Sequence, residues 1–139
     1  MSKPTVYYSG NMTPSYEMYY HHGKLLQEGI SSKYVLSLPD IEDFFHNEKF
    51  VVRHDIARIS KSDLLVLNLG LTDTNHHLTG SIVEVYEAYT QGIPVYAYTP
   101  EDMVRSKQAN SPWLKHFITH DFGTYEDLVD FLLFQENLV

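Results

Sequence analysis

Residues 80–92 read GSIVEVYEAYTQG, and residues 94–98 read PVYAY. The first segment has the features of a short helix, because Ser81 is a residue type that caps helices and Gly92 readily takes the left-handed conformation that ends them. Apolar and aromatic residues recur between them at helical spacing, namely Ile82, Val85 and Tyr89. The second segment is a run of β-branched and aromatic residues, so we expect a helix that leads directly into a buried strand.

Glu84 lies near the start of this predicted helix, where two interpretations are open. The first N–H groups of a helix lack partners, and the helix dipole is positive there. Gly80 and Ser81 would therefore offer a binding site for a phosphate or a sugar hydroxyl, one turn from the Glu84 carboxylate. Alternatively, Ser81 and Glu84 form a capping box, in which the serine caps the helix and the glutamate binds back to the serine N–H. The second interpretation implies no chemistry.

The length and charge of the chain restrict what it could be. It has 139 residues, 43% of them hydrophobic, which predicts one domain over residues 1–139 with one core. Ten Lys and Arg residues against 18 Asp and Glu residues give a formal charge of -8, so the basic surface expected of a protein that binds nucleic-acid polymers or anionic membranes is missing. With no cysteine, no apolar run of membrane-spanning length and no signal sequence at residues 1–4, we expect a soluble, cytoplasmic protein.

Strand-like and helix-like segments alternate along the whole chain. The predicted strands are residues 5–8, 34–38, 64–70, 94–98 and 117–119, and the predicted helices are residues 13–29, 51–62, 80–92 and 124–137. Thr13-Pro14 and Thr124 are expected to open the first and the last of these helices. This order predicts an α/β fold, a single-domain, doubly wound, five-stranded parallel sheet of flavodoxin/Rossmann-like type with helices on both faces.

The predicted helix at residues 51–62 carries a second acid. Val52, Ile56 and Ile59 fall at helical spacing and are expected to form its buried side. Asp55 and Arg58 lie off that side and three residues apart, so their simplest interpretation is a weak ion pair in solvent worth ~0.2–0.5 kcal/mol.

Small and polar residues gather at one edge of the predicted sheet. In sheets of this kind, ligands bind beyond the carboxyl ends of the strands, where the strand order reverses. The segments expected at that edge are Ser9-Gly10, Asn68-Gly70 and Gly80-Ser81. We therefore expect a ligand crevice there, beside Glu84.

Cofactor and metal motifs are not found. The glycines do not form a G-x-G-x-x-G or Walker A pattern. The histidine pairs His21-His22 and His76-His77 are the best metal candidates, but adjacent histidines point apart and no H-E-x-x-H spacing occurs. We expect neither a cofactor nor a metal.

Taken in order, several segments resemble the nucleoside 2-deoxyribosyltransferase family and its relatives that hydrolyse deoxynucleoside 5′-monophosphates. They are VYYSG at residues 6–10, DIARI at 55–59 with SDLLVL at 62–67, Gly80-Ser81 with Glu84 and Ala88, and GIPV at 92–95. Ser111-Pro112-Trp113 and the closing strand and helix also fit, so the resemblance spans nearly the whole chain. It implies an enzyme acting at the N-glycosidic bond of 2′-deoxynucleosides, with a small deoxynucleoside or deoxynucleotide and a free nucleobase as partners.

The resemblance also implies a role for each matching residue. Glu84 would be the nucleophile of a retaining double displacement, which forms a deoxyribosyl-enzyme that a second base or water then resolves. Tyr7 would position Glu84, and Asp55 would hydrogen-bond the leaving base and help to protonate it. The sugar and its 5′ group would be lined by Ser9, Gly10, Gly80 and Ser81.

Two positions depart from the family's pattern. Leu78 stands six residues before Glu84, where many transferases carry an aspartate that reads the base and the monophosphate hydrolases carry a serine. Tyr86 stands where the family usually has glycine, and it could narrow the pocket or simply pack. Three functions therefore stay open: a nucleoside deoxyribosyltransferase, a deoxynucleoside 5′-monophosphate N-glycosidase, and a nucleotide-binding or sensor domain without turnover. The first is favoured, because phosphate recognition normally adds a cation and the crevice segments hold none.

The aromatic content predicts that copies of the chain associate. Interfaces favour tyrosine, and two predicted helices carry more of it than one core should need: Tyr16, Tyr19 and Tyr20 on the first, Tyr86 and Tyr89 on the Glu84 helix. In the family that the chain resembles, a loop residue of the neighbouring chain completes each pocket. We expect Asn110 to be that loop residue, because a neutral amide can both donate a hydrogen bond to a 5′-hydroxyl and accept one from it. We expect a homo-oligomer, at least a dimer.

Overall fold

The computed structural model describes residues 2–12, 16–38, 48–73 and 76–135. Five strands form one sheet in the order β2-β1-β3-β5-β7, and every neighbouring pair is parallel. The strands are β1 (Thr5–Ser9), β2 (Val35–Ser37), β3 (Leu64–Asn68), β5 (Val95–Tyr98) and β7 (His120–Asp121). The five-stranded parallel α/β sheet expected from the alternating segments is confirmed.

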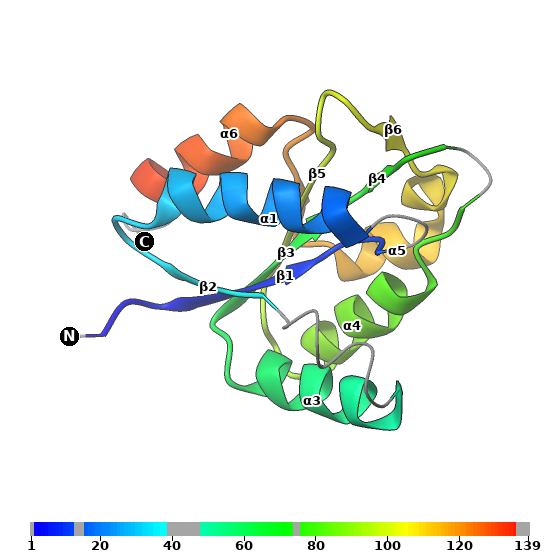
Figure 1. Ribbon diagram of the computed structural model, residues 1–139, viewed down its shortest axis with the longest axis horizontal. Helices are drawn as coiled ribbons and strands as arrows, with labels where there is room; N and C mark the ends of the chain where they lie inside the picture. Colours follow the sequence, from blue (N-terminus) through cyan, green and yellow to red (C-terminus); the bar gives the residue numbers. More distant parts are fainter. Residues whose placement is uncertain (1, 13–15, 39–47, 74–75, 136–139) are drawn as a thin grey trace.

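Helices cover both faces of this sheet, as Figure 1 shows. One face carries α1 (Tyr16–Ile30) and α6 (Tyr125–Asp130). The opposite face carries α3 (Glu48–Ser60), α4 (Thr79–Thr90) and α5 (Pro112–Phe117). The arrangement is therefore doubly wound, with the Glu84 helix on the second face.

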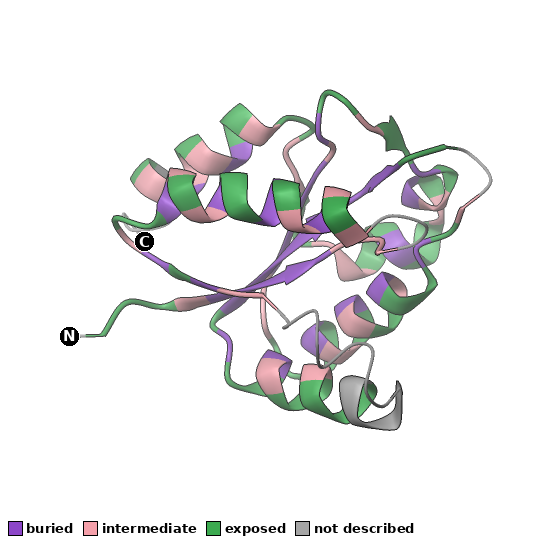
Figure 2. Ribbon diagram, in the orientation of Figure 1, coloured by how far each residue is buried: buried purple, intermediate pink, exposed green. Residues whose placement is uncertain are grey.

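Each central strand contributes to two separate cores, because its side chains alternate between the two faces. In β1, Val6 and Tyr8 pack in the core under α1 and α6, whereas Tyr7 packs in the core under α3 and α4. All five residues of β3 are buried, as expected of a strand covered on both faces. Figure 2 shows the buried residues concentrated along the sheet and on the inner sides of the helices.

The segment after β5 contains more structure than the sequence predicts. A short antiparallel pair joins β4 (Gly70–Leu71) to β6 (Val104–Arg105), and the 3-10 helix η1 (Lys107–Asn110) precedes α5. The strand predicted at residues 117–119 is wrong, because Phe117 ends α5 and β7 begins only at His120. The Ser111 side chain caps α5 by accepting a hydrogen bond from the Trp113 N–H, and this start commits the following turn to a helix.

Other helix ends agree with the sequence. Thr124 caps α6 as predicted, by accepting a hydrogen bond from the Asp127 N–H, and the chain continues as the π-helical segment η2 (Phe131–Gln135). Gly92 has a φ of 73°, the left-handed value expected after α4. The predicted opening of the first helix at Thr13-Pro14 lies outside the described residues. In the described ranges, no helix combines the length and the apolar composition needed to cross a membrane.

Candidate active site

The first turn of α4 differs from the predicted one. The helix begins at Thr79, with Leu78 as its N-cap residue and no side-chain cap, so Ser81 lies inside the first turn. The Leu78 N–H donates to the side chain of Gln108 over 2.6 Å, which holds the start of the helix from a distant segment. The capping box of Ser81 and Glu84 is therefore wrong. Ser81 is only 3% exposed, and its hydroxyl has no hydrogen-bond partner among the described residues.

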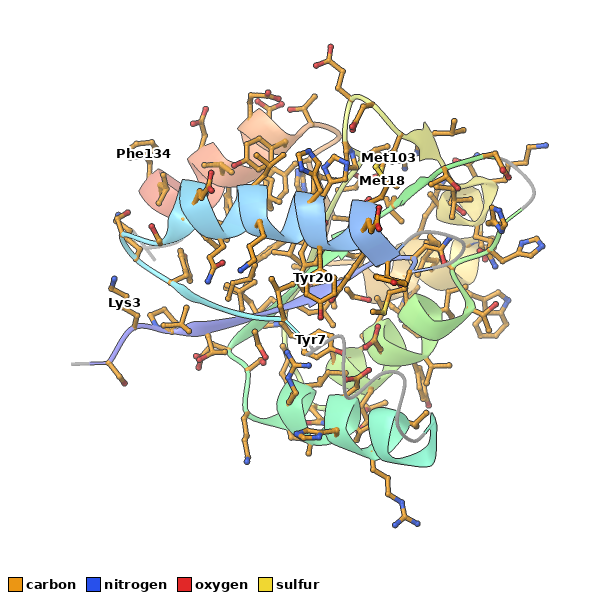
Figure 3. The ribbon with its side chains drawn as sticks, viewed as in Figure 1. Lys3, Tyr7, Met18, Tyr20, Met103 and Phe134 are labelled. Carbon is orange, nitrogen blue, oxygen red and sulfur yellow. The ribbon has the colours of Figure 1, made fainter. Side chains whose placement is uncertain are left out.

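Two hydroxyl groups from β1 hold Glu84. The Tyr7 hydroxyl donates to Glu84 Oε2, and the Ser9 hydroxyl donates to Glu84 Oε1 over 2.8 Å. Tyr7 and Ser9 are two residues apart on one strand, so their side chains lie on the same face and reach the same carboxylate. Figure 3 shows Tyr7 between the sheet and the helices α3 and α4. The strand thus fixes the orientation of the carboxylate.

The surroundings of Glu84 change its acidity. Burial raises the pKa of Glu84 from 4.5 to about 7, while the hydrogen bonds from Tyr7 and Ser9 lower it. The neighbouring Asp55 carboxylate raises the pKa further, and the positive charge of Arg58 lowers it. Burial also raises the pKa of Tyr7 far above its ordinary value, so the Tyr7 hydroxyl stays a proton donor to Glu84. A carboxyl group with a pKa near neutrality is typical of catalytic sites.

Asp55 and Arg58 face this site from α3, which corrects the predicted orientation of that helix. Val52 and Ile56 are 57% and 36% exposed, and of the three residues predicted to be buried only Ile59 is. Asp55 and Arg58 are partly buried, with 3.6 Å between Asp55 Oδ1 and Arg58 Nη1. The apolar pattern is misleading here because Val52 and Ile56 line an open cavity rather than the packed core.

That cavity has a volume of about 420 Å³. Six of the predicted site residues line it: Tyr7, Gly10, Asp55, Gly80, Ser81 and Glu84. Burial raises the pKa of Asp55, and the charges of Arg58 and His54 and the Tyr7 hydroxyl oppose this. In the described part of the chain, no Lys, Arg or His lines the cavity. The site therefore presents two carboxyl groups without a cation at its surface.

Several residues expected in the crevice lie outside it, among them Ser9, Asn68, Gly70 and Asn110. Ser9 is buried and reaches the site only through Glu84. Asn68 donates to the Tyr8 hydroxyl over 2.9 Å and accepts from the Gly70 N–H over 2.7 Å, so its role is structural. Asn110 is exposed at the end of η1 and does not line the cavity of its own chain.

The two departures from the family's pattern have different positions. Leu78 is 1% exposed and lines the cavity, so an apolar side chain stands where many transferases read the base. Tyr86 is 51% exposed, and its ring packs against Phe117 with 5.3 Å between the ring centres. Tyr86 does not line the cavity, so it packs rather than narrowing the pocket.

Sequence reasoning missed several cavity residues: Asn11, Met12, Tyr19, Val52 and Ile56. Asn11 and Met12 directly follow Gly10, so the rule that ligands bind beyond the strand ends could have identified them. Tyr19 gave no signal, because a helical tyrosine usually serves packing. Its hydroxyl donates to the Tyr8 carbonyl oxygen over 2.7 Å.

One histidine of each pair lies close to an aspartate. His22 Nε2 lies 3.1 Å from Asp102 Oδ1, and His76 Nε2 lies 3.5 Å from Asp73 Oδ2. Within the residues that the structure describes, no three His, Asp or Glu side chains are grouped so that they could hold a metal ion.

Comparison with known proteins identifies neighbours in structure but not in sequence. No family model matches the chain, and neither does any curated protein. A conserved protein from Enterococcus faecalis V583 aligns with a TM-score of 0.64 at 16% identity, over 95% of this chain and 98% of that one.

Two named enzymes are also similar. CMP N-glycosidase BcmB from Clostridium botulinum aligns with a TM-score of 0.60 at 13% identity, over 97% of this chain and 99% of that one. A 2-deoxyribosyltransferase from Leishmania mexicana aligns with a TM-score of 0.55 at 18% identity, over 69% of this chain and 64% of that one. These neighbours agree with the family resemblance in the sequence, and at such identities the likeness itself establishes a shared fold.

Proposed function

We propose that this protein cleaves the N-glycosidic bond of 2′-deoxynucleosides with Glu84 as the nucleophile. The observation that carries the proposal is the Glu84 carboxylate, which Tyr7 and Ser9 hold in the wall of a cavity that Asp55 also lines. A nucleophile fixed in orientation at a substrate-sized cavity is the arrangement that a displacement at carbon needs. The shared fold with a 2-deoxyribosyltransferase and a CMP N-glycosidase supports the same class of reaction.

In the first step, a Glu84 oxygen attacks the anomeric carbon and the bond from that carbon to the base nitrogen breaks. The electron pair of this bond leaves with the base, and protonated Asp55 donates the proton that neutralises it. Burial raises the pKa of Asp55, which favours the protonated form. The product is a deoxyribosyl ester of Glu84 and a free base.

In the second step, an acceptor attacks the same carbon and releases Glu84 as a carboxylate. A free base attacks through a ring nitrogen and gives its proton to the Asp55 carboxylate, which restores both carboxyl groups. Water would follow the same path in hydrolysis, so the two outcomes differ only in the molecule that occupies the base site. Two displacements at one carbon retain its configuration.

Nucleosides suit the cavity better than 5′-monophosphates. Phosphate groups are usually bound by Arg or Lys, whereas the described lining residues supply two carboxyl groups and no cation. The buried Ser81 hydroxyl offers a neutral donor and acceptor, which matches a sugar hydroxyl. A deoxynucleoside 5′-monophosphate N-glycosidase is the second candidate, and the similarity to a CMP N-glycosidase favours it.

The experiment is incubation of the protein with each common 2′-deoxynucleoside and its 5′-monophosphate, with and without a second free base. Chromatography then measures released and exchanged bases. We expect base exchange with nucleosides, and loss of activity by ~10³-fold or more in Glu84→Gln, because an amide is a poor nucleophile.

Glu87→Gln is the matched control, because Glu87 is one turn further along α4 and does not line the cavity. It should keep wild-type rates. A Glu84→Gln protein with full activity would exclude the proposed nucleophile. No free base from any mixture would favour a nucleotide-binding domain without turnover.

We further propose that the working unit is a homo-oligomer in which Asn110 of a neighbouring copy approaches the cavity. Exposed aromatic and apolar residues on α4 and α5 support this: Val83, Tyr86, Tyr89 and Trp113. Val83 belongs both to this surface and to the cavity wall, so a neighbouring copy seated on the surface would border the substrate.

A further inference from the structure

Arg58 is held from three directions beside the proposed active site. Its Nε and Nη2 atoms both donate to the Ser37 hydroxyl oxygen, over 3.0 and 2.6 Å. Its Nη1 atom lies 3.6 Å from Asp55 Oδ1, and its guanidinium carbon lies 5.4 Å from the centre of the Tyr7 ring. With 18% of its side chain exposed, Arg58 is not an ordinary surface residue near the end of a helix.

The register of the sheet explains how these partners come together. β1 and β2 are parallel neighbours, and Tyr7 pairs with Ser37. Paired residues of neighbouring strands project on the same face, so the Tyr7 ring and the Ser37 hydroxyl lie side by side under α3. Arg58 therefore joins β2, the tyrosine that holds Glu84, and the second carboxyl group of the site.

Arg58 does not line the cavity, so it would act through its neighbours rather than on the substrate. A guanidinium group stays positively charged at any pH at which the protein is folded. Two carboxyl groups that share one cavity repel each other when both are ionised, which drives one of them to take up a proton. A fixed positive charge beside them offsets that repulsion.

We propose that Arg58 is a positioning residue that fixes the Tyr7 ring and the Asp55 carboxyl group and places a fixed positive charge beside the two carboxyl groups of the site. Its consequence for catalysis rests on the proposed function, whereas its effect on the ionisation of Glu84 does not. In the described chain, the charged and titratable groups around the two carboxyl groups are Tyr7 from β1, Tyr19 from α1, and His54 and Arg58 from α3. The charge of Arg58 lowers the pKa of both Asp55 and Glu84, against the larger effect of burial.

The test compares three variants by carboxyl-carbon NMR titration, with the Glu84 signal assigned by its absence in Glu84→Gln. Arg58→Met removes the charge and should raise the midpoint of the Glu84 titration by ~0.5–1 pH unit. Its kcat near neutral pH should fall ~2- to 5-fold, in step with the smaller ionised fraction of Glu84, while KM changes less than ~2-fold, because no substrate contact is lost. Arg58→Lys keeps the charge and should restore most of the Glu84 midpoint, and Ser37→Ala, which removes the anchor, should shift it part of the way.

An Arg58→Met protein with the wild-type Glu84 midpoint and kcat would overturn the inference, and so would a loss confined to KM. If circular dichroism shows that Arg58→Met is unfolded, Ser37→Ala decides by the same two measurements. Failure of the proposed function gives a different result, in which the wild-type protein releases no base although Arg58→Met still shifts the Glu84 midpoint.

Discussion

The ionised Glu84 carboxylate lowers the stability of the fold that holds it. Its pKa is raised from 4.5 in a free side chain to about 7, so between these pH values the folded protein holds a proton that the unfolded chain releases. The fold therefore loses stability as the pH rises through this window. The full cost, reached above about pH 7, is about 3 kcal/mol in the free energy of unfolding.

Glu84→Gln should consequently stabilise the protein, and more so in alkaline than in acidic solution. The amide keeps the shape of the side chain but has no charge to desolvate. We expect a gain of ~1–3 kcal/mol in the free energy of unfolding at about pH 8.5 and a smaller gain at about pH 5, measured by urea denaturation. Glu87→Gln is again the control. Equal gains at the two pH values would contradict a desolvated carboxylate at position 84.

The start of α4 shows which part of an element the sequence can predict. The helix and the strand after it follow from local spacing, and Gly92 ends the helix as expected. The first turn does not follow from local spacing. Its N-cap position is set by Gln108, whose side chain accepts a hydrogen bond from the Leu78 N–H thirty residues away. A serine three residues before a glutamate fits a capping box equally well, and only the tertiary contact separates the two cases.

The helix α3 shows the opposite failure, in which a correct element is given the wrong orientation. The helical spacing of its apolar residues is real. Such spacing shows that the side chains share one face of the helix, but it does not show whether that face packs in the core or lines a cavity. Val52 and Ile56 line the cavity, and Arg58 is drawn towards the sheet by the Ser37 hydroxyl. The pairing of Ser37 with Tyr7, which sets this orientation, depends on strand register and has no local signal.

At the scale of the whole molecule, the sequence predicts the topology, because strands and helices alternate along the chain. A parallel sheet with helices on both faces follows from the order of the segments, and it brings Tyr7, Gly10 and Glu84 to one cavity. The tyrosines of the first helix do not form the exposed surface expected from the sequence, because Tyr19 of α1 is only 3% exposed and belongs to the core. The exposed aromatic surface lies on α4 and α5 instead, where Trp113 is 76% exposed.

Trp113→Glu should therefore convert an oligomer into monomers. A charge in an aromatic interface is left without a partner, and burying it is costly. Light scattering at micromolar concentration should show monomers of about the chain's 16.1 kDa, with reduced base exchange if the neighbouring copy completes the pocket. Phe134→Glu is the matched control, because Phe134 is 64% exposed on the opposite face and lies far from Tyr7 in Figure 3. A wild-type protein that is monomeric and fully active would contradict the shared pocket.

Mass spectrometry of the protein quenched during turnover tests the role of Glu84 most directly. A slowly reacting deoxynucleoside is mixed with the enzyme and the reaction is stopped by acid. The protein is then digested and the masses of its peptides are measured. We predict a mass increase of one deoxyribosyl group on the peptide that contains Glu84, formed together with free base, lost on addition of an acceptor base and missing in Glu84→Gln. Rapid base release with no adduct at any time, or an adduct on another residue, would contradict the assignment of Glu84 as the nucleophile.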